Sequence, residues 1–149
     1  MFTIQKLSKE EKHVITKWRY SGDYASFNYA VEGGGWIESY CTQDDSPCYC
    51  CIEEEMIVGM FLFIPEKNNE FRLLINPEML NQGYGKKITN EAIEIGIKEL
   101  HYNQISLIVR KNHAVAIALY QKMGFEIVGE TMEEIDGEEV DFYRMYFKA

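Results

Sequence analysis

The stretch from Leu73 to Lys87 constrains the fold more than any other part of the chain. Its apolar start ends just before Pro77, which lacks a backbone N–H and therefore stops pairing within a sheet. Gly83 and Gly85 follow, and a long helical pattern begins at this glycine pair. Because glycine has no Cβ, the backbone at both positions can lie close to a ligand. A strand, a glycine turn and a helix N-terminus in this order predict a diphosphate site.

Two familiar phosphate-binding patterns do not fit this stretch. A P-loop needs glycine where Leu80 stands and serine or threonine in place of Lys87. A dinucleotide-binding turn needs a third glycine at the position of Ile88. What remains is a Gly-x-Gly turn with Lys86 and Lys87 adding positive charge beside the helix N-terminus. A glycine turn that only caps a helix is the structural alternative.

Length and composition favour a single domain over residues 1–149 with a sizeable core, because 46% of the residues are hydrophobic. The net charge of −9 argues against nucleic-acid binding by bulk attraction. No apolar run approaches the roughly 20 residues that cross a bilayer, so no membrane partner is expected. The polar N-terminal residues do not form a signal peptide, which predicts a cytoplasmic location.

The four cysteines, Cys41, Cys48, Cys50 and Cys51, do not form the paired Cys-x-x-Cys spacing of a zinc site. We expect them to be small apolar residues in a reducing compartment, with no metal bound. A redox or metal protein built on this cluster is an alternative that the spacing disfavours.

Hydrophobic periodicity predicts five strands before the last quarter of the chain, at residues 2–6, 48–52, 56–64, 71–75 and 104–110. A helix follows the capping box Ser8-x-x-Glu11, and another runs from the glycine pair to about Leu100. Short turns indicate an antiparallel meander from 48 to 75. The helical crossover makes the strands at 71–75 and 104–110 parallel.

A second motif spans Asn112 to Phe125, a short helix with an asparagine at its start and a glycine at its end. This segment and the glycine turn resemble motifs B and A of the GNAT acetyltransferases. Motif B is Asn-x-x-Ala-x-x-Leu-Tyr-x-Lys-x-Gly-Phe, and the chain matches it at Asn112, Leu119, Tyr120, Lys122, Gly124 and Phe125. Motif A is Arg/Gln-x-x-Gly-x-Gly/Ala, in which Leu80 replaces the first residue and both glycines match. The resemblance covers residues 70 to 131.

The resemblance implies a mixed α/β (α+β) fold. Its central sheet would have about seven mostly antiparallel strands flanked by about four helices, with a splayed parallel pair forming the CoA cleft. Acetyl-CoA would be the co-substrate and a primary amine the acceptor, in a monomer or homodimer. The implied cofactor-binding residues are Leu74, Ile75, Leu80, Asn81, Gln82, Gly83, Tyr84, Gly85, Lys86 and Asn112.

The resemblance also makes Tyr120 the general acid beside the thioester sulfur; an ordinary packed tyrosine is the structural alternative. A backbone N–H at Leu74 or Ile75 could stabilise the carbonyl oxygen. The general base stays unassigned between Glu70, which reads more simply as a surface acid, and a water relay. A non-catalytic acyl-CoA-binding module is the main alternative function.

Two further segments have expected roles near the acceptor. In the aromatic stretch from 18 to 29, we expect Trp18 in the core and Tyr20 or Tyr24 at the acceptor pocket. Residues 126–131 and 140–147 predict a final hairpin, with Asp136-Gly137 in its turn. The acidic residues crowding this hairpin are either a solvated tip or a rim that attracts a cationic amine.

Overall fold

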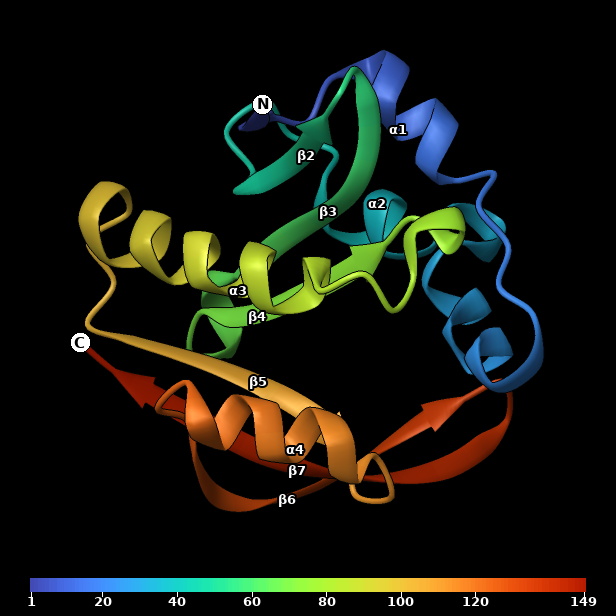
Figure 1. The fold of residues 1–149 in the computed structure, drawn as a ribbon. Coiled ribbons are helices and arrows are strands. Elements are labelled where there is room, and N and C mark those ends of the chain that lie inside the picture. Colours follow the sequence, from blue (N-terminus) through green and yellow to red (C-terminus); the bar gives the residue numbers. More distant parts are fainter. The chain divides into compact units, whose positions relative to one another are not determined.

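Seven strands form one sheet in the order β1-β2-β3-β4-β5-β7-β6 (Figure 1). The computed structural model describes residues 1–149, which divide into two compact units. The first unit comprises residues 1–63 and 72–88, and the second comprises residues 64–71 and 89–149. The predicted single domain stays a prediction. None of the helices has the length and apolar character needed to span a membrane.

The bounds of the elements follow the predicted order. The strands are β1 (Phe2–Lys6), β2 (Cys48–Glu53), β3 (Met56–Ile64), β4 (Glu70–Ile75), β5 (Gln104–Arg110), β6 (Glu126–Ile135) and β7 (Glu138–Lys148). The α-helices are α1 (Lys9–Ile15), α2 (Gly35–Tyr40), α3 (Tyr84–Glu94) and α4 (Ala114–Lys122). Shorter 3-10 segments are η1 (Gly22–Ala30), η2 (Glu32–Gly34), η3 (Pro65–Lys67) and η4 (Pro77–Met79), and the π-helical η5 (Ile95–Glu99) extends α3.

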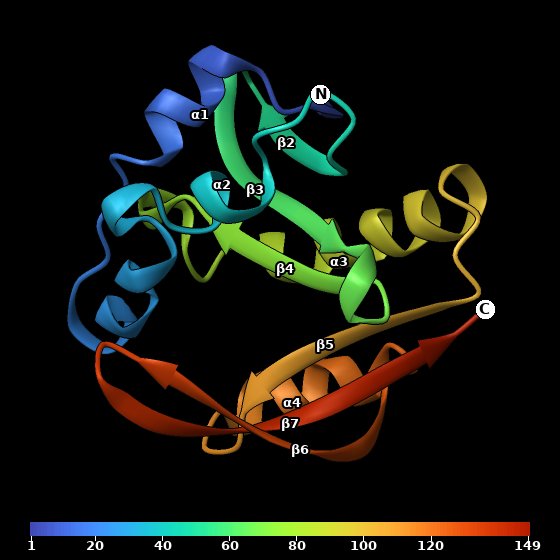
Figure 2. The same cartoon turned by 180° about the vertical axis from the view of Figure 1, so that it is seen from behind.

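The first unit is built on antiparallel pairing of β1 with β2 and of β2 with β3. Its first helix begins at the predicted capping box, in which Ser8 and Glu11 satisfy each other's backbone N–H groups. Gly59 of β3 allows a close approach, because a Cβ there would lie 2.9 Å from the Leu74 carbonyl oxygen. Figure 2 shows β3 beside β4, with α2 lying across this part of the sheet.

The expectation of four reduced cysteines was wrong for two of them. Cys41, which follows α2, forms a disulfide with Cys48 at the start of β2, and their Cα atoms lie 6.1 Å apart. Cys50 and Cys51 are not in a disulfide and are buried within β2. Spacing along the chain did not reveal the pair, because the turn at residues 42–47 brings the two sulfurs together only in the folded unit.

The second unit contains the parallel contact and the long hairpin. Glu70 of β4 pairs with Ser106 of β5 in parallel register, as the crossover predicted. The β5–β7 and β6–β7 pairs are antiparallel. Both hairpin strands extend further than predicted, because Asp136 and Gly137 have φ values of 52° and 81°. Two left-handed residues form a tight two-residue turn, so pairing continues up to Ile135 and Glu138.

Candidate cofactor and catalytic site

The glycine turn before α3 contains one glycine with a positive φ and one without. Gly83 has a φ of +84°, a conformation that favours glycine, and its carbonyl oxygen accepts the Lys87 N–H at 3.3 Å. Gly85 lies in the first turn of α3 without a positive φ, and a Cβ built on it would meet nothing within 4 Å. The positive φ therefore explains the glycine at 83, whereas neither φ nor packing gives a reason for one at 85. Close approach of a ligand does give such a reason.

Replacing Gly85 with alanine is expected to raise the KM for acetyl-CoA about tenfold, which corresponds to about 1.4 kcal/mol of binding. The added methyl group would occupy the space proposed for a phosphate. Thermal stability should stay level or rise slightly, because alanine favours helices over glycine. Steady-state kinetics and thermal unfolding measure the two effects.

The matched control for Gly85→Ala is Gly129→Ala. Gly129 also lacks a positive φ and has open space at its Cβ, but it lies in β6. This variant should leave the KM for acetyl-CoA unchanged. An unaltered KM in Gly85→Ala would remove the argument that a ligand approaches this backbone.

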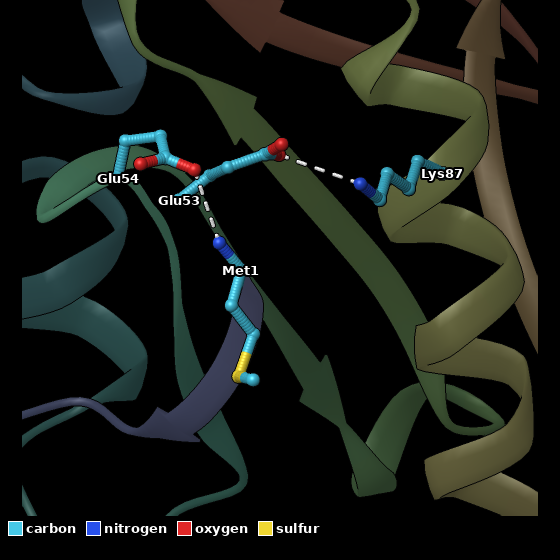
Figure 3. A network of polar contacts seen from close by, with 4 residues as sticks. All are labelled: Met1, Glu53, Glu54 and Lys87. Carbon is cyan, nitrogen blue, oxygen red and sulfur yellow. Dashed lines mark hydrogen bonds and ion pairs between the residues drawn. The ribbon is translucent and has the colours of Figure 1, made fainter.

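The two lysines beside the turn differ in what they can contribute. Lys86 is exposed and has no ion-pair partner. Lys87, by contrast, places its Nζ 3.4 Å from a carboxylate oxygen of Glu53 and 4.4 Å from the ring centroid of Phe2. Figure 3 shows the ion pair of Lys87 with Glu53, and beside it the ion pair of the Met1 amino group with Glu54. Lys87 therefore joins α3 to the β1–β2 pair, and Lys86 is the lysine with an uncommitted charge.

The remaining residues of this loop have distinct environments. Desolvation and the Glu53 carboxylate raise the pKa of Tyr84, so its phenol stays neutral. Leu80 is half-buried, so an apolar side chain suits its place in the loop. Asn81 is exposed in a left-handed conformation with a φ of +62°, and Gln82 and Gly83 are exposed after it. The turn is thus exposed over residues 81–83, and its predicted contact with a diphosphate stays a prediction.

The end of β4 is held by several hydrogen bonds. The Asn76 N–H donates to the Val58 carbonyl at 2.9 Å, and its side-chain amide donates to Ile57 at 2.8 Å. The Tyr20 hydroxyl donates to the Ile75 carbonyl at 2.5 Å. Leu74 is buried and Ile75 is half-buried. Trp18 lies in the core as predicted, and Tyr20 is also buried, so Tyr24 is the more exposed of the two pocket candidates.

In the second unit, the predicted helix cap is shifted by one residue. The first intrahelical bond of α4 goes from the Ile117 N–H to the His113 carbonyl, so His113 rather than Asn112 is the N-cap. Asn112 lies in the exposed turn before it, and its predicted contact with CoA stays a prediction. The helix ends as expected, because Gly124 has a φ of +108° and packs against Phe147.

The ring of Tyr120 is packed against a neighbouring ring, whereas its hydroxyl has no hydrogen-bond partner in the chain. It is half-buried on α4, and its ring meets the Phe125 ring edge-on with centroids 5.8 Å apart. Its hydroxyl makes no hydrogen bond within the chain. Burial raises the pKa of Tyr120 to about 12, so the phenol keeps its proton at neutral pH. A neutral phenol with a free O–H is suited to donate a proton.

Glu70 is neither a surface acid nor an open general base. Its side chain is 1% exposed, and its carboxylate lies 2.5 Å from the Arg144 guanidinium of β7. The surface interpretation was wrong because β4 begins inside the sheet, beside Ser106. A carboxylate engaged in this way is a structural ion pair, which favours the water relay as the route for the amine proton.

The partners that hold these groups come from distant parts of the chain. Arg144 opposite Glu70 and Glu53 opposite Lys87 come from distant strands. Arg72 of β4 stacks over the rings of Trp36 and Tyr40 on α2, at 5.2 and 5.1 Å from their centroids. The separations along the sequence range from 32 to 74 residues, and no short motif carries such contacts.

Two curated bacterial acetyltransferases are similar in sequence to part of this chain. Spermidine N(1)-acetyltransferase of Escherichia coli strain K12 is 35% identical over 78 residues, covering 51% of this chain and 42% of that protein. The corresponding Vibrio cholerae enzyme is 32% identical over 82 residues, covering 54% of this chain and 47% of that protein. The matched segment thus spans less than half of each of these relatives.

Solved structures establish the fold. The spermidine N-acetyltransferase of Vibrio cholerae in complex with CoA and spermine superposes with a TM-score of 0.79 at 20% identity, covering 99% of this chain and 95% of that one. The same enzyme with manganese ions gives 0.76 at 22% identity, covering 99% and 92%. The predicted fold class is confirmed.

The family model described as the acetyltransferase (GNAT) family matches residues 11–125. This range includes the glycine turn before α3 and the whole of α4. Both motifs that carried the resemblance therefore lie inside the matched region, and the chain belongs to the GNAT acetyltransferase family.

Proposed function

We propose that this protein transfers the acetyl group of acetyl-CoA to a primary amine, and that the amine belongs to a polyamine. The observation that carries the donor site is the space beside Gly85, where a Cβ would meet no protein atom within 4 Å and the φ angle does not require glycine. Family membership supports acetyl-CoA as the donor. The names of the curated relatives, which are spermidine acetyltransferases, support the polyamine.

In this proposal the neutral amine attacks the thioester carbonyl carbon directly. A backbone N–H at Leu74 or Ile75 would stabilise the carbonyl oxygen as it gains negative charge. The carbon–sulfur bond then breaks, and the Tyr120 hydroxyl gives its proton to the departing thiolate. The extra proton on the new amide nitrogen leaves through water, and a proton from water restores the Tyr120 hydroxyl. No cysteine nucleophile is needed, and burial raises the pKa of the Cys50 thiol, which disfavours the reactive thiolate.

A thiol-release assay over a panel of amines tests the proposal, after acetyl-CoA binding has been measured by calorimetry. Turnover with spermidine or spermine is the expected result. Binding without turnover on any amine would support the acyl-CoA-binding module instead. Absence of binding would overturn the proposed donor site.

The β6–β7 hairpin is the proposed attractor for the cationic acceptor. Glu134 and Glu139 are direct cross-strand partners, although like charges in this arrangement repel. Glu130 has a cationic partner, Lys111, whereas Glu133 and Glu138 form no ion pair. A polyamine would relieve this uncompensated charge (the hairpin is visible in Figure 2).

Neutralising Glu133, Glu134 and Glu138 together to glutamine is expected to raise the KM for spermidine about fivefold, since each exposed pair contributes about 0.2–1 kcal/mol. The KM for acetyl-CoA should stay unchanged. The control replaces Glu10, Glu66 and Glu91, three exposed acids outside the hairpin, with glutamine. It changes the net charge equally and should leave both constants unaltered. Equal effects of the two triple variants would show that only net charge matters.

A further inference from the structure

Contacts to both the backbone and the ring hold Tyr20 in place, apart from any contact of its hydroxyl. The Asn28 side chain accepts the Tyr20 N–H at 2.7 Å and donates to the Tyr20 carbonyl at 3.0 Å. The Phe27 ring packs against the Tyr20 ring with centroids 6.0 Å apart. The segment entering η1 is therefore closed on itself by Asn28, and Tyr20 projects from it with a defined direction.

The Tyr20 hydroxyl contacts the end of β4, the strand that leads to the glycine turn. Its hydroxyl donates to the carbonyl of Ile75, the last residue of β4, at 2.5 Å. Burial raises the pKa of Tyr20, so the hydroxyl remains a donor throughout the physiological pH range. The bond fixes the peptide plane that follows the proposed donors for the thioester oxygen.

Tyr24, four residues further on, contacts the same loop at a second point. Its hydroxyl lies 2.8 Å from the Oδ1 atom of Asn81. Asn81 has a φ of +62° and comes two residues before Gly83. Between Ile75 and Asn81 the chain makes only the single turn of η4, which Asn76 caps by accepting the Glu78 N–H at 2.9 Å.

We propose that Tyr20 and Tyr24 are positioning residues that support the cofactor loop at its two ends, so that η1 and the glycine turn are ordered together. This inference rests on the proposed function. Neither hydroxyl is assigned to a substrate atom: each acts through the backbone or side chain of a loop residue. Because Tyr20 and Tyr24 belong to one segment, binding of CoA at the turn restricts the residues that precede and begin η1.

The two tyrosines should have separable kinetic effects. Tyr20 supports the strand end, where charge develops on the thioester oxygen, so Tyr20→Phe should lower kcat about three- to tenfold. Tyr24 supports the approach to the glycine turn, so Tyr24→Phe should raise the Kd for CoA about three- to tenfold with little change in kcat. A general loss of stability would not divide between the two constants in this way.

The test measures CoA binding by calorimetry, kcat with spermidine and the melting temperature for each variant. Asn81→Gly removes the acceptor of the Tyr24 bond without straining a left-handed residue. In the Asn81→Gly background, Tyr24→Phe should change the Kd for CoA less than twofold, because their shared bond is already absent. Tyr146→Phe is the matched control, since its hydroxyl accepts from Asn68 in the second unit.

The outcomes separate this inference from the proposed function. A wild-type chain that does not bind CoA would refute the proposed function and the inference with it. Binding by the wild type with equal Kd values in Tyr24→Phe and Tyr146→Phe would refute the inference alone. Additive effects of Tyr24→Phe and Asn81→Gly would also overturn it. If the Tyr20→Phe variant does not fold, the CoA affinities of the Tyr24 and Asn81 variants still decide whether the inference holds.

Discussion

Replacement of Tyr120 by phenylalanine is expected to lower kcat about a hundredfold, the usual size of a lost general acid. The substitution removes the hydroxyl and leaves the ring packed against Phe125, so the fold and the melting temperature should change little. Because the hydroxyl makes no hydrogen bond within the chain, no internal partner is left unsatisfied. Thiol release under saturating acetyl-CoA and spermidine measures the change.

The pH profile gives an independent check on Tyr120. Since its pKa is raised to about 12, the phenol keeps its proton as the pH rises, and the acid is lost only near that value. The wild-type rate should therefore rise with pH as the amine loses its proton, without a falling limb below about pH 10. An unchanged kcat in Tyr120→Phe would show that the residue serves only in packing. The control variant Tyr146→Phe should leave both kcat and the pH profile unchanged.

Glu70→Ala is expected to lower the free energy of unfolding by about 3 kcal/mol, which makes it the largest stability effect predicted for this chain. The Glu70 carboxylate is almost fully buried, and its removal leaves the Arg144 guanidinium without this partner inside the sheet. The side chain of Arg144 is 24% exposed, so partial access to water keeps the loss near the lower end for a broken buried pair. Urea unfolding with an unchanged m-value measures it.

Two further variants separate structure from catalysis at Glu70. Glu66→Gln neutralises a nearby exposed acid on η3 and should stay within about 0.5 kcal/mol of the wild type. Replacing Glu70 and Arg144 together with leucine should recover much of the lost stability, because no charge is then left unpaired. If folded Glu70→Gln lost most of its kcat while keeping its stability, Glu70 would be the general base and the structural interpretation would be wrong.

The sequence predicted those parts of the site that depend on local backbone chemistry. Gly124 ends a helix and Asp136-Gly137 forms a tight turn, because each preference is intrinsic to the residue. The Ser8–Glu11 capping box and the parallel pairing after the crossover were also confirmed. The first turn of α4 was placed one residue early, because Asn112 has the stronger N-cap preference whereas His113 takes the position without a side-chain hydrogen bond.

Contacts between distant segments could not be read in this way. Nothing along the chain joins Glu70 to Arg144, Cys41 to Cys48, or the Tyr20 hydroxyl to Ile75. These pairs form only when strands and turns settle into register, and their partners are ordinary residues in ordinary sequence surroundings. As a result, the surface interpretation of Glu70 and the reduced state of two cysteines were wrong.

Local sequence therefore determined the family, the strand–turn–helix around Gly83 and the helix bearing Tyr120, because turn and helix-end preferences belong to individual residues and their neighbours. Tertiary structure alone decided which charges are free. It paired Lys87 with Glu53 and Glu70 with Arg144, and it left Lys86 and the Tyr120 hydroxyl without a partner in the chain. It also placed the Tyr20 and Tyr24 hydroxyls against Ile75 and Asn81. The physical reason is that the role of a charge or hydroxyl depends on its neighbours in space, and packing sets those neighbours.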